Sequence, residues 1–84
     1  MRARKGEKII DVWKISHEKI TEQWVQDAFD EGQIYWYQSN ENILIFPQTH
    51  GGAASVGFYL IYLNKKKYRA INPKRFEREF ILLE

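Results

Sequence analysis

The sequence predicts a single α+β domain, in which a bent antiparallel sheet of about five strands is combined with two helices. Two observations predict this class. Runs of β-branched and aromatic residues of strand length recur between turn residues, and one segment of the chain changes to a helical period. No repeat, low-complexity tract or Pro/Gly/Ser-rich linker interrupts the chain, so residues 1–84 are expected to form one domain.

The core of this domain must be dense, because a chain of 84 residues buries only about 60% of its unfolded surface. The composition meets this need with 44% hydrophobic and 15% aromatic residues. There is no cysteine, so disulfides and thiolate zinc sites are excluded. The sequence shows neither a signal-peptide h-region nor an apolar run of transmembrane length, which favours an intracellular soluble protein without membrane contact.

The first strand and the first helix are expected in the N-terminal part of the chain. Residues 1–5 have the character of a frayed basic arm, and KIIDVWKI (8–15) is rich in strand-forming residues. Ser16 is a candidate N-cap for an amphipathic helix over about residues 17–31, and Gly32 can end that helix in a left-handed conformation. The apolar face of the helix combines residues at helical spacing, namely Ile20, Trp24, Val25, Ala28 and Phe29.

Two further runs, QIYWYQ (33–38) and NILIFPQ (42–48), predict a hairpin joined by the polar residues 39–42. Alternation along the first of these strands gives aromatic side chains on both faces. Ile34 and Trp36 point to one face, and Tyr35 and Tyr37 point to the other. The sequence does not decide which face is buried, and pairing with a second copy in a symmetric dimer is one way to cover the remaining face.

The C-terminal part of the chain predicts a flexible turn over THGGA (49–53), followed by a central strand over SVGFYLIYL (55–63). NKKK (64–67) is the expected loop of a hairpin whose return strand is YRAI (68–71).

A short helix over about residues 73–79 follows, with Asn72 as its cap and Pro73 at its first position. Phe76 and Phe80, spaced i and i+4, would close the open end of the sheet, and residues 81–84 can add an edge strand.

Residues 54–80 resemble a family of small phage and prophage proteins. The usual C-terminal pattern of that family is A-x-x-G-D-(Y/W)-(I/L)-(I/V), a hairpin, and then Y-x-(I/C)-x-P-x-x-F-E-x-x-(F/Y). The matching residues are Ala54, Gly57, Tyr59, Leu60 and Ile61 in the first part, and Tyr68, Ile71, Pro73, Phe76, Glu77 and Phe80 in the second.

The match requires a slide of one residue at Ala70 or Ile71, and the strand over residues 9–14 is also similar to the family's N-terminal strand. Phe58 departs from the pattern because the family commonly has Asp after the glycine, so the turn must be held in another way. The resemblance implies a phage-encoded setting and a similar fold, without an assigned catalytic activity.

Charge is strongly segregated along the chain, although the formal net charge is only +2. Residues 1–8 carry an excess of three bases, and residues 65–84 carry an excess of four. The middle part, residues 9–64, has an excess of five acids. The molecule is therefore polarised rather than basic.

The residues for catalysis or metal binding are sparse. The only histidines are His17 and His50, and no serine lies in the sequence context of a nucleophile. No histidine has a ligand-type neighbour at metal-site spacing, so neither a metal nor a cofactor is expected. We therefore expect a protein that is not an enzyme. A glycine-rich turn, formed by Thr49, His50, Gly51 and Gly52, is a candidate ligand loop.

Three acids at the C-terminal end of the predicted first helix, where a helix favours positive charge, indicate a surface for a cationic partner. The candidate partner-binding surface joins these acids to the nearby tyrosines: Asp27, Asp30, Glu31, Tyr35 and Tyr37. Together with the phage setting that the resemblance implies, this surface gives the expected function of a phage or prophage accessory protein, in the cytoplasm of the bacterial host, that docks on a host protein such as a defence factor and modulates it.

Two alternatives stay open. The first is a sponge for a small nucleotide-like ligand, in which the candidate ligand loop and the tyrosines line a pocket. The second is binding of single-stranded nucleic acid by a basic patch, for which the candidate residues are Lys65, Lys66, Lys67 and Arg69.

Overall fold

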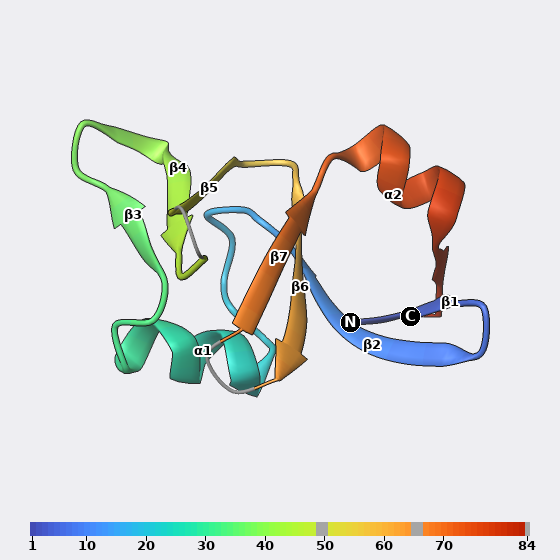
Figure 1. Cartoon of the computed structure of the whole chain (residues 1–84). Helices are drawn as coiled ribbons and strands as arrows, with labels where there is room; N and C mark the ends of the chain where they lie inside the picture. The colour runs from blue at the N-terminus through green and yellow to red at the C-terminus, as the bar shows by residue number, and fades with distance from the viewer. Residues whose placement is uncertain (49–50, 65–66, 84) are drawn as a thin grey trace.

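The computed structural model describes residues 1–48, 51–64 and 67–83 of the chain (Figure 1). Within these residues the chain forms eight strands and two helices, and the strands build a five-stranded and a three-stranded antiparallel sheet. The predicted α+β class is confirmed. In chain order the elements are β1 (Arg2–Lys5), β2 (Lys8–Lys14), α1 (Gln23–Asp30), β3 (Tyr35–Tyr37), β4 (Asn40–Phe46), β5 (Gly52–Ser55), β6 (Tyr59–Asn64), β7 (Lys67–Ile71), α2 (Pro73–Glu79) and β8 (Ile81–Leu82).

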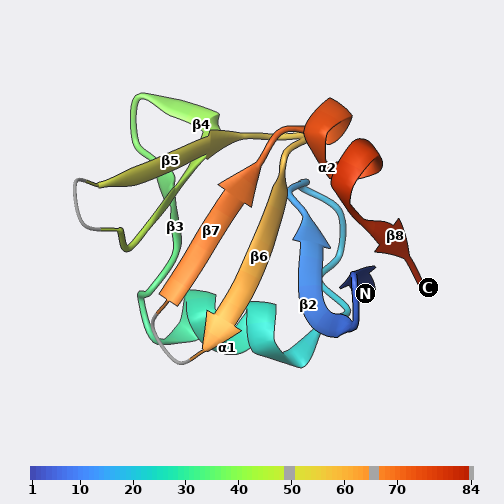
Figure 2. The ribbon, with the colours of Figure 1, turned by 45° about the vertical axis from the view of Figure 1, so that its right-hand side comes forward.

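The five-stranded sheet is the central layer of the fold. Its strand order is β7-β6-β2-β1-β8, so both ends of the chain lie in this sheet, whereas the three-stranded sheet has the order β3-β4-β5. Figure 2 shows α1 and α2 on different sides of the central layer. Each side has its own hydrophobic core.

The α1-side core is the larger one, and it joins α1 and the three-stranded sheet to the five-stranded sheet. Val25 and Ala28 of the helix are buried there, with Trp24 and Phe29 packed around them, as the helical spacing predicts. Aromatic contacts continue across the layers, since Trp24 stacks on Tyr62 with ring centroids 5.0 Å apart. The three-stranded sheet contributes Trp36, Leu44, Phe46 and Ala54, and Ile34, just before β3, is buried with them.

The α2-side core is organised by Phe76, which is 2% exposed and stacks on Tyr59 at a centroid distance of 3.8 Å. The helix begins where its local signals predict: the Asn72 side chain accepts a hydrogen bond of 2.8 Å from the Arg75 backbone N–H, and Pro73 occupies the first turn. Phe80 stacks on Phe76 at 5.0 Å. The expected packing role of the two phenylalanines is confirmed.

The N-terminal residues correct the prediction of a frayed arm, because residues 2–5 form β1 between β2 and β8. Ala3 is fully buried in the α2-side core, and its neighbours Arg2 and Arg4 are exposed and alternate with it along the strand. Charged residues are common on strands at or near the edge of a sheet. The basic composition of this segment is therefore compatible with a strand as well as with the predicted frayed arm. The N-terminal ammonium pairs with Glu22 and anchors the beginning of the chain.

The predicted helix over residues 17–31 is also corrected, because α1 begins only at Gln23. The Ser16 hydroxyl accepts a local hydrogen bond from the Glu18 N–H and caps no helix. The chain before α1 is held by tertiary contacts instead: Ile15 exchanges backbone hydrogen bonds with Gly57 and Phe58, and His17 lies against Trp36. Ile20 still packs into the α1-side core, but from outside the helix.

The predicted strand over residues 55–63 is two strands, β5 and β6, joined by a tight turn. The Phe58 N–H donates to the Ser55 carbonyl at 3.1 Å, and Gly57 has a φ of 101°, which L side chains rarely adopt. Phe58, which follows Gly57 in this turn, is packed against the α1-side core. The predicted alternation in β6 is confirmed, since Leu60 and Ile61 lie in opposite cores.

The two helices of the described residues have 8 and 7 residues, and neither is long and apolar enough to cross a membrane.

Candidate functional site: the outer face of the three-stranded sheet

The three-stranded sheet has one buried face and one exposed face. Its buried face carries Trp36, Leu44 and Ala54, which are aligned across the strands. Along β3 and β4 the next residues point the other way, so the outer face displays Tyr35 and Ile45 as a cross-strand pair, with Ala53 of β5 beside Ile45. The question that the sequence left open is thereby answered: the Ile34/Trp36 side is buried, and the tyrosine side is exposed.

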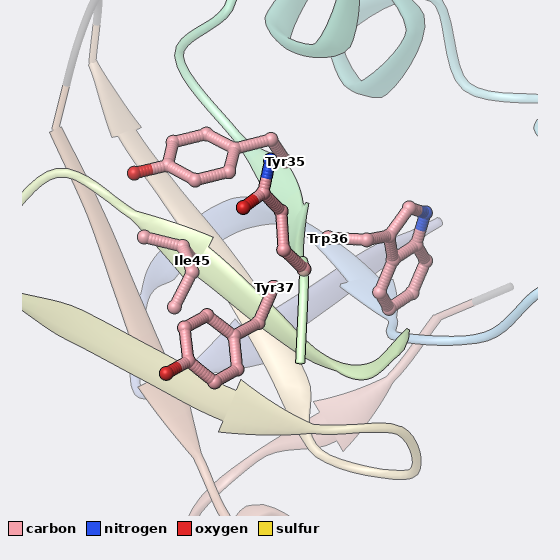
Figure 3. Close-up of a pocket in the computed structure, with 5 residues that line it drawn as sticks. Tyr35, Trp36, Tyr37 and Ile45 are labelled. Atoms are coloured by element: carbon pink, nitrogen blue, oxygen red, sulfur yellow. The ribbon is translucent and has the colours of Figure 1, made fainter. Parts of the chain in front are cut away.

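The two tyrosines form the most prominent part of this outer face. Tyr35 is 55% exposed and Tyr37 is 46% exposed. In Figure 3 both rings lie on the same side as Ile45, while Trp36 points to the opposite side. Single exposed apolar side chains are common, but a contiguous exposed apolar patch of this kind marks an interaction site.

The end of α1 directs β3 to this position. Glu31 is the C-cap residue, and Gly32 follows it with a φ of 73°. The Gln33 N–H donates to the Ala28 carbonyl at 2.8 Å, and the Gly32 N–H donates to Phe29 at 3.1 Å. These are the two hydrogen bonds of a Schellman motif, so the predicted role of Gly32 is confirmed. The chain therefore leaves the helix along a fixed path, and β3 begins at Tyr35.

The far end of the hairpin differs from the predicted turn over residues 39–42, because β4 already begins at Asn40. The register shifts between Trp36 and Tyr37, so that Tyr37 pairs with Asn40. The shift is a bulge-like irregularity, and such features re-aim side chains at the ends of strands. It leaves Tyr37 at the rim of the outer face.

Two adjoining grooves flank the Tyr35–Ile45 pair. One has a volume of about 420 Å³ and is lined by Tyr35, Trp36, Tyr37, Gln38 and Ile45. The other has a volume of about 330 Å³ and shares Tyr35 and Ile45 with the first. Its remaining lining comes from Gly32, Gln33, Phe46, Pro47, Gln48 and Gly51. The outer face is thus a shallow aromatic and aliphatic surface with a hollow on either side of Tyr35.

The predicted acidic residues lie beside this surface rather than in it. Asp27 accepts a hydrogen bond of 2.8 Å from the Gln23 side chain, and Asp30 accepts one of 2.9 Å from Gln26, so both carboxylates are directed along the exposed side of α1. No basic residue occupies the last turn of the helix. Figure 1 shows that this end of α1 leads directly into β3. The carboxylates of these acids can therefore attract an approaching positively charged partner, although none of them lines either groove.

The candidate ligand loop is divided by the structure. Thr49 and His50 lie outside the described residues. Gly51 lines the second groove together with Tyr35, and its N–H donates to the Gln48 carbonyl at 2.9 Å. Gly52 belongs to β5 and is buried under Phe46, whose ring would clash with an added Cβ. The prediction of a turn over residues 49–53 is therefore wrong for Gly52 and Ala53, which lie in β5, and Gly52 has a packing role.

The candidate nucleic-acid patch is placed elsewhere. Lys65 and Lys66 lie outside the described residues, whereas Lys67 and Arg69 are exposed on β7. Both share a face of that strand with Ile71, a member of the α2-side core, so they lie on the opposite side of the central sheet from α1. The structure does not bring this patch to the tyrosines.

The residue types that bind metals are dispersed within residues 1–48, 51–64 and 67–83. No three His, Cys, Asp or Glu side chains come together there as metal ligands would. The Nε2–H of His17 donates to Asn42 Oδ1 at 3.1 Å, and the ring lies on Trp36 with ring centroids 4.3 Å apart, so its neighbours explain it as a packing residue.

The sequence predicted Tyr35 and Tyr37 as candidate residues but not Ile45, which lies beside Tyr35 on the same face. Ile45 belongs to an apolar run, and only the strand register shows that it faces outward beside Tyr35. Comparison with protein-family models, with curated proteins and with solved structures finds no match.

Proposed function

We propose that this protein is a non-enzymatic docking module that binds another protein through the outer face of the three-stranded sheet. The observation that carries the proposal is the exposure of Tyr35 and Tyr37 on either side of Ile45, next to two grooves. Tyrosines that combine a large apolar ring with a polar tip are the usual anchors of protein interfaces. The acidic end of α1 supplies a neighbouring charge that steers a basic partner.

The biological setting of this proposal is a phage or prophage accessory protein that modulates or inhibits a host protein, such as a defence factor, in the bacterial cytoplasm. It rests on the resemblance of residues 54–80 to small phage proteins. The docking surface itself lies outside that segment, which is consistent with a shared scaffold that carries a surface specific to this chain.

Capture and variant analysis test the docking proposal. The tagged protein is purified from bacterial cells and analysed by native mass spectrometry, and the co-purified protein is then titrated against variants. Tyr35→Ala should weaken binding by at least about 2 kcal/mol, as for a hot-spot residue, whereas Ile9→Ala, an exposed apolar control outside the site, should have little effect. Asp27→Lys should mainly slow association, and the slowing should diminish with added salt.

One observation favours a second candidate function, the binding of a small nucleotide-like ligand. Gly51 of the candidate ligand loop and Tyr35 line the same groove of about 330 Å³, within the size range of roughly 300–1,000 Å³ for small-molecule sites. A retained small mass in the native spectrum that disappears in Tyr35→Ala would support this candidate over protein docking. Tight binding of oligothymidylate that is lost in a Lys65/Lys66/Lys67 triple alanine variant would contradict both.

A further inference from the structure

The side of the five-stranded sheet that carries α2 is covered over only part of its length. Along β6, Ile61 is 3% exposed, but Leu63, the next residue on the same side, is 54% exposed. Along β7, Ile71 is buried and Arg69 is exposed. With 7 residues, α2 spans only about 10 Å. The part of this side that α2 covers therefore ends near Ile61, and the surface around Leu63 and Arg69 is exposed to solvent.

The open part forms a second groove, distinct from the tyrosine surface. It has a volume of about 210 Å³, and its residues come from four strands and the end of α2. Aliphatic side chains form its floor, and Phe80 forms a wall. The lining residues are Lys5, Lys8, Ile10, Ile61, Leu63, Arg69 and Phe80.

The rim of this groove is positively charged, because the sheet order brings the two basic ends of the sequence together. Lys5 and Lys8 face each other in the β1–β2 hairpin, and Arg69 stands opposite Ile61 on β7. Lys5 is paired with Glu79 at 3.2 Å. Among the residues that the structure describes, Lys8 and Arg69 form no ion pair. Their charges are therefore available to a ligand.

The groove is better suited to aliphatic side chains than to nucleotides. Its volume of about 210 Å³ lies below the range of roughly 300–1,000 Å³ that small-molecule sites occupy. Base stacking needs a free aromatic face, but the Phe80 ring stacks on Phe76 at 5.0 Å and has the Lys5 ammonium 5.5 Å from its centroid. The floor of the groove offers only aliphatic contacts.

We propose that this groove docks an acidic segment of a partner protein, with aliphatic side chains on the Ile10/Ile61/Leu63 floor and carboxylates at Lys8 and Arg69. Charge complementarity and the size of the groove select this occupant. The acidic end of α1 and the basic groove lie on opposite sides of the central sheet. This inference goes beyond the tyrosine surface and does not depend on it.

The test uses the full chain and a fluorescein-labelled peptide, Gly-Glu-Leu-Asp-Glu-Leu-Asp-Gly, with fluorescence anisotropy as the measurement. The double variant Lys8→Glu/Arg69→Glu should weaken binding by at least about tenfold. The matched control is Lys74→Glu/Arg78→Glu, which makes the same change in net charge on exposed positions of α2. It should weaken binding by less than about threefold, because screened charges outside the groove contribute little.

The apolar contribution is tested separately with a second matched pair. Leu63→Ala should weaken binding by several fold, whereas Ile9→Ala should not, although Ile9 is also exposed. Replacing both leucines of the peptide by alanine should have an effect similar to that of Leu63→Ala.

Several results would overturn the inference. They are an absence of binding to the wild type, an equal loss in the two double variants, an equal effect of Ile9→Ala and Leu63→Ala, and displacement of the peptide by an equal concentration of oligothymidylate.

Discussion

Removing the ring of Phe76 is the most direct test of how the α2 side of the fold is held together. The side chain is 2% exposed and lies between Tyr59 and Phe80, with centroid distances of 3.8 and 5.0 Å. Truncation of a buried phenylalanine to alanine costs about 3–5 kcal/mol. Each lost aromatic pair adds about 0.5–1.5 kcal/mol to simple area burial, so we expect Phe76→Ala to lie in the upper half of that range.

The matched control is its neighbour Arg75, which lies on the same helix but is exposed and pairs with Glu79. An exposed ion pair of the i,i+4 type contributes about 0.3–0.5 kcal/mol, so Arg75→Ala should change the free energy of unfolding by less than about 1 kcal/mol. Urea unfolding monitored by tryptophan fluorescence measures both variants. If Arg75→Ala costs as much as Phe76→Ala, the segment is organised by its charges, and the packing argument is refuted.

Two further predictions concern packing in β5 and the charge on α2. Gly52→Ala should destabilise the fold by about 1–3 kcal/mol in urea melts, because the added Cβ would meet the buried Phe46 ring; a neutral result would contradict the close approach. Hydrogen bonds from Arg75 and Lys5 lower the pKa of Glu79 below its usual 4.5, so its contribution to stability is present above that value and is lost as the pH falls through the lowered pKa. The difference in urea midpoint between wild type and Glu79→Gln should therefore be largest near neutral pH and shrink on acidification; a difference that is constant with pH would exclude this linkage.

The parts of the fold that local sequence signals control could be predicted from the sequence. Asn72 and Pro73 define the beginning of α2, and Gly32 defines the end of α1, because capping hydrogen bonds involve only neighbouring residues. The beginning of α1 could not be predicted. Ile20 fits the helical face, but the backbone before Gln23 is fixed by contacts with distant residues.

In the candidate site, too, some features depend on neighbouring residues and could be predicted, whereas others depend on distant contacts and could not. Alternation in β3 separated Tyr35 from Trp36, which is a local property. The pairing of Tyr35 with Ile45 depends on a register that includes an irregularity at Tyr37, and no local pattern specifies it. The basic groove combines Lys8 of β2 with Arg69 of β7, two strands that lie on either side of β6, so only the sheet order reveals it.

The pairing of β1 with β8 has a consequence for how the chain folds. Ala3 and Leu82 are register partners, so this contact closes a loop that contains almost the whole sequence. The β1–β2 hairpin, in contrast, closes through Gly6 and Glu7 alone. Because loop closure costs entropy before distant contacts repay it, the hairpin should form early and β8 should dock last. During synthesis, β1 would then leave the ribosome well before its second neighbour exists and would expose an open strand edge until the chain is nearly finished.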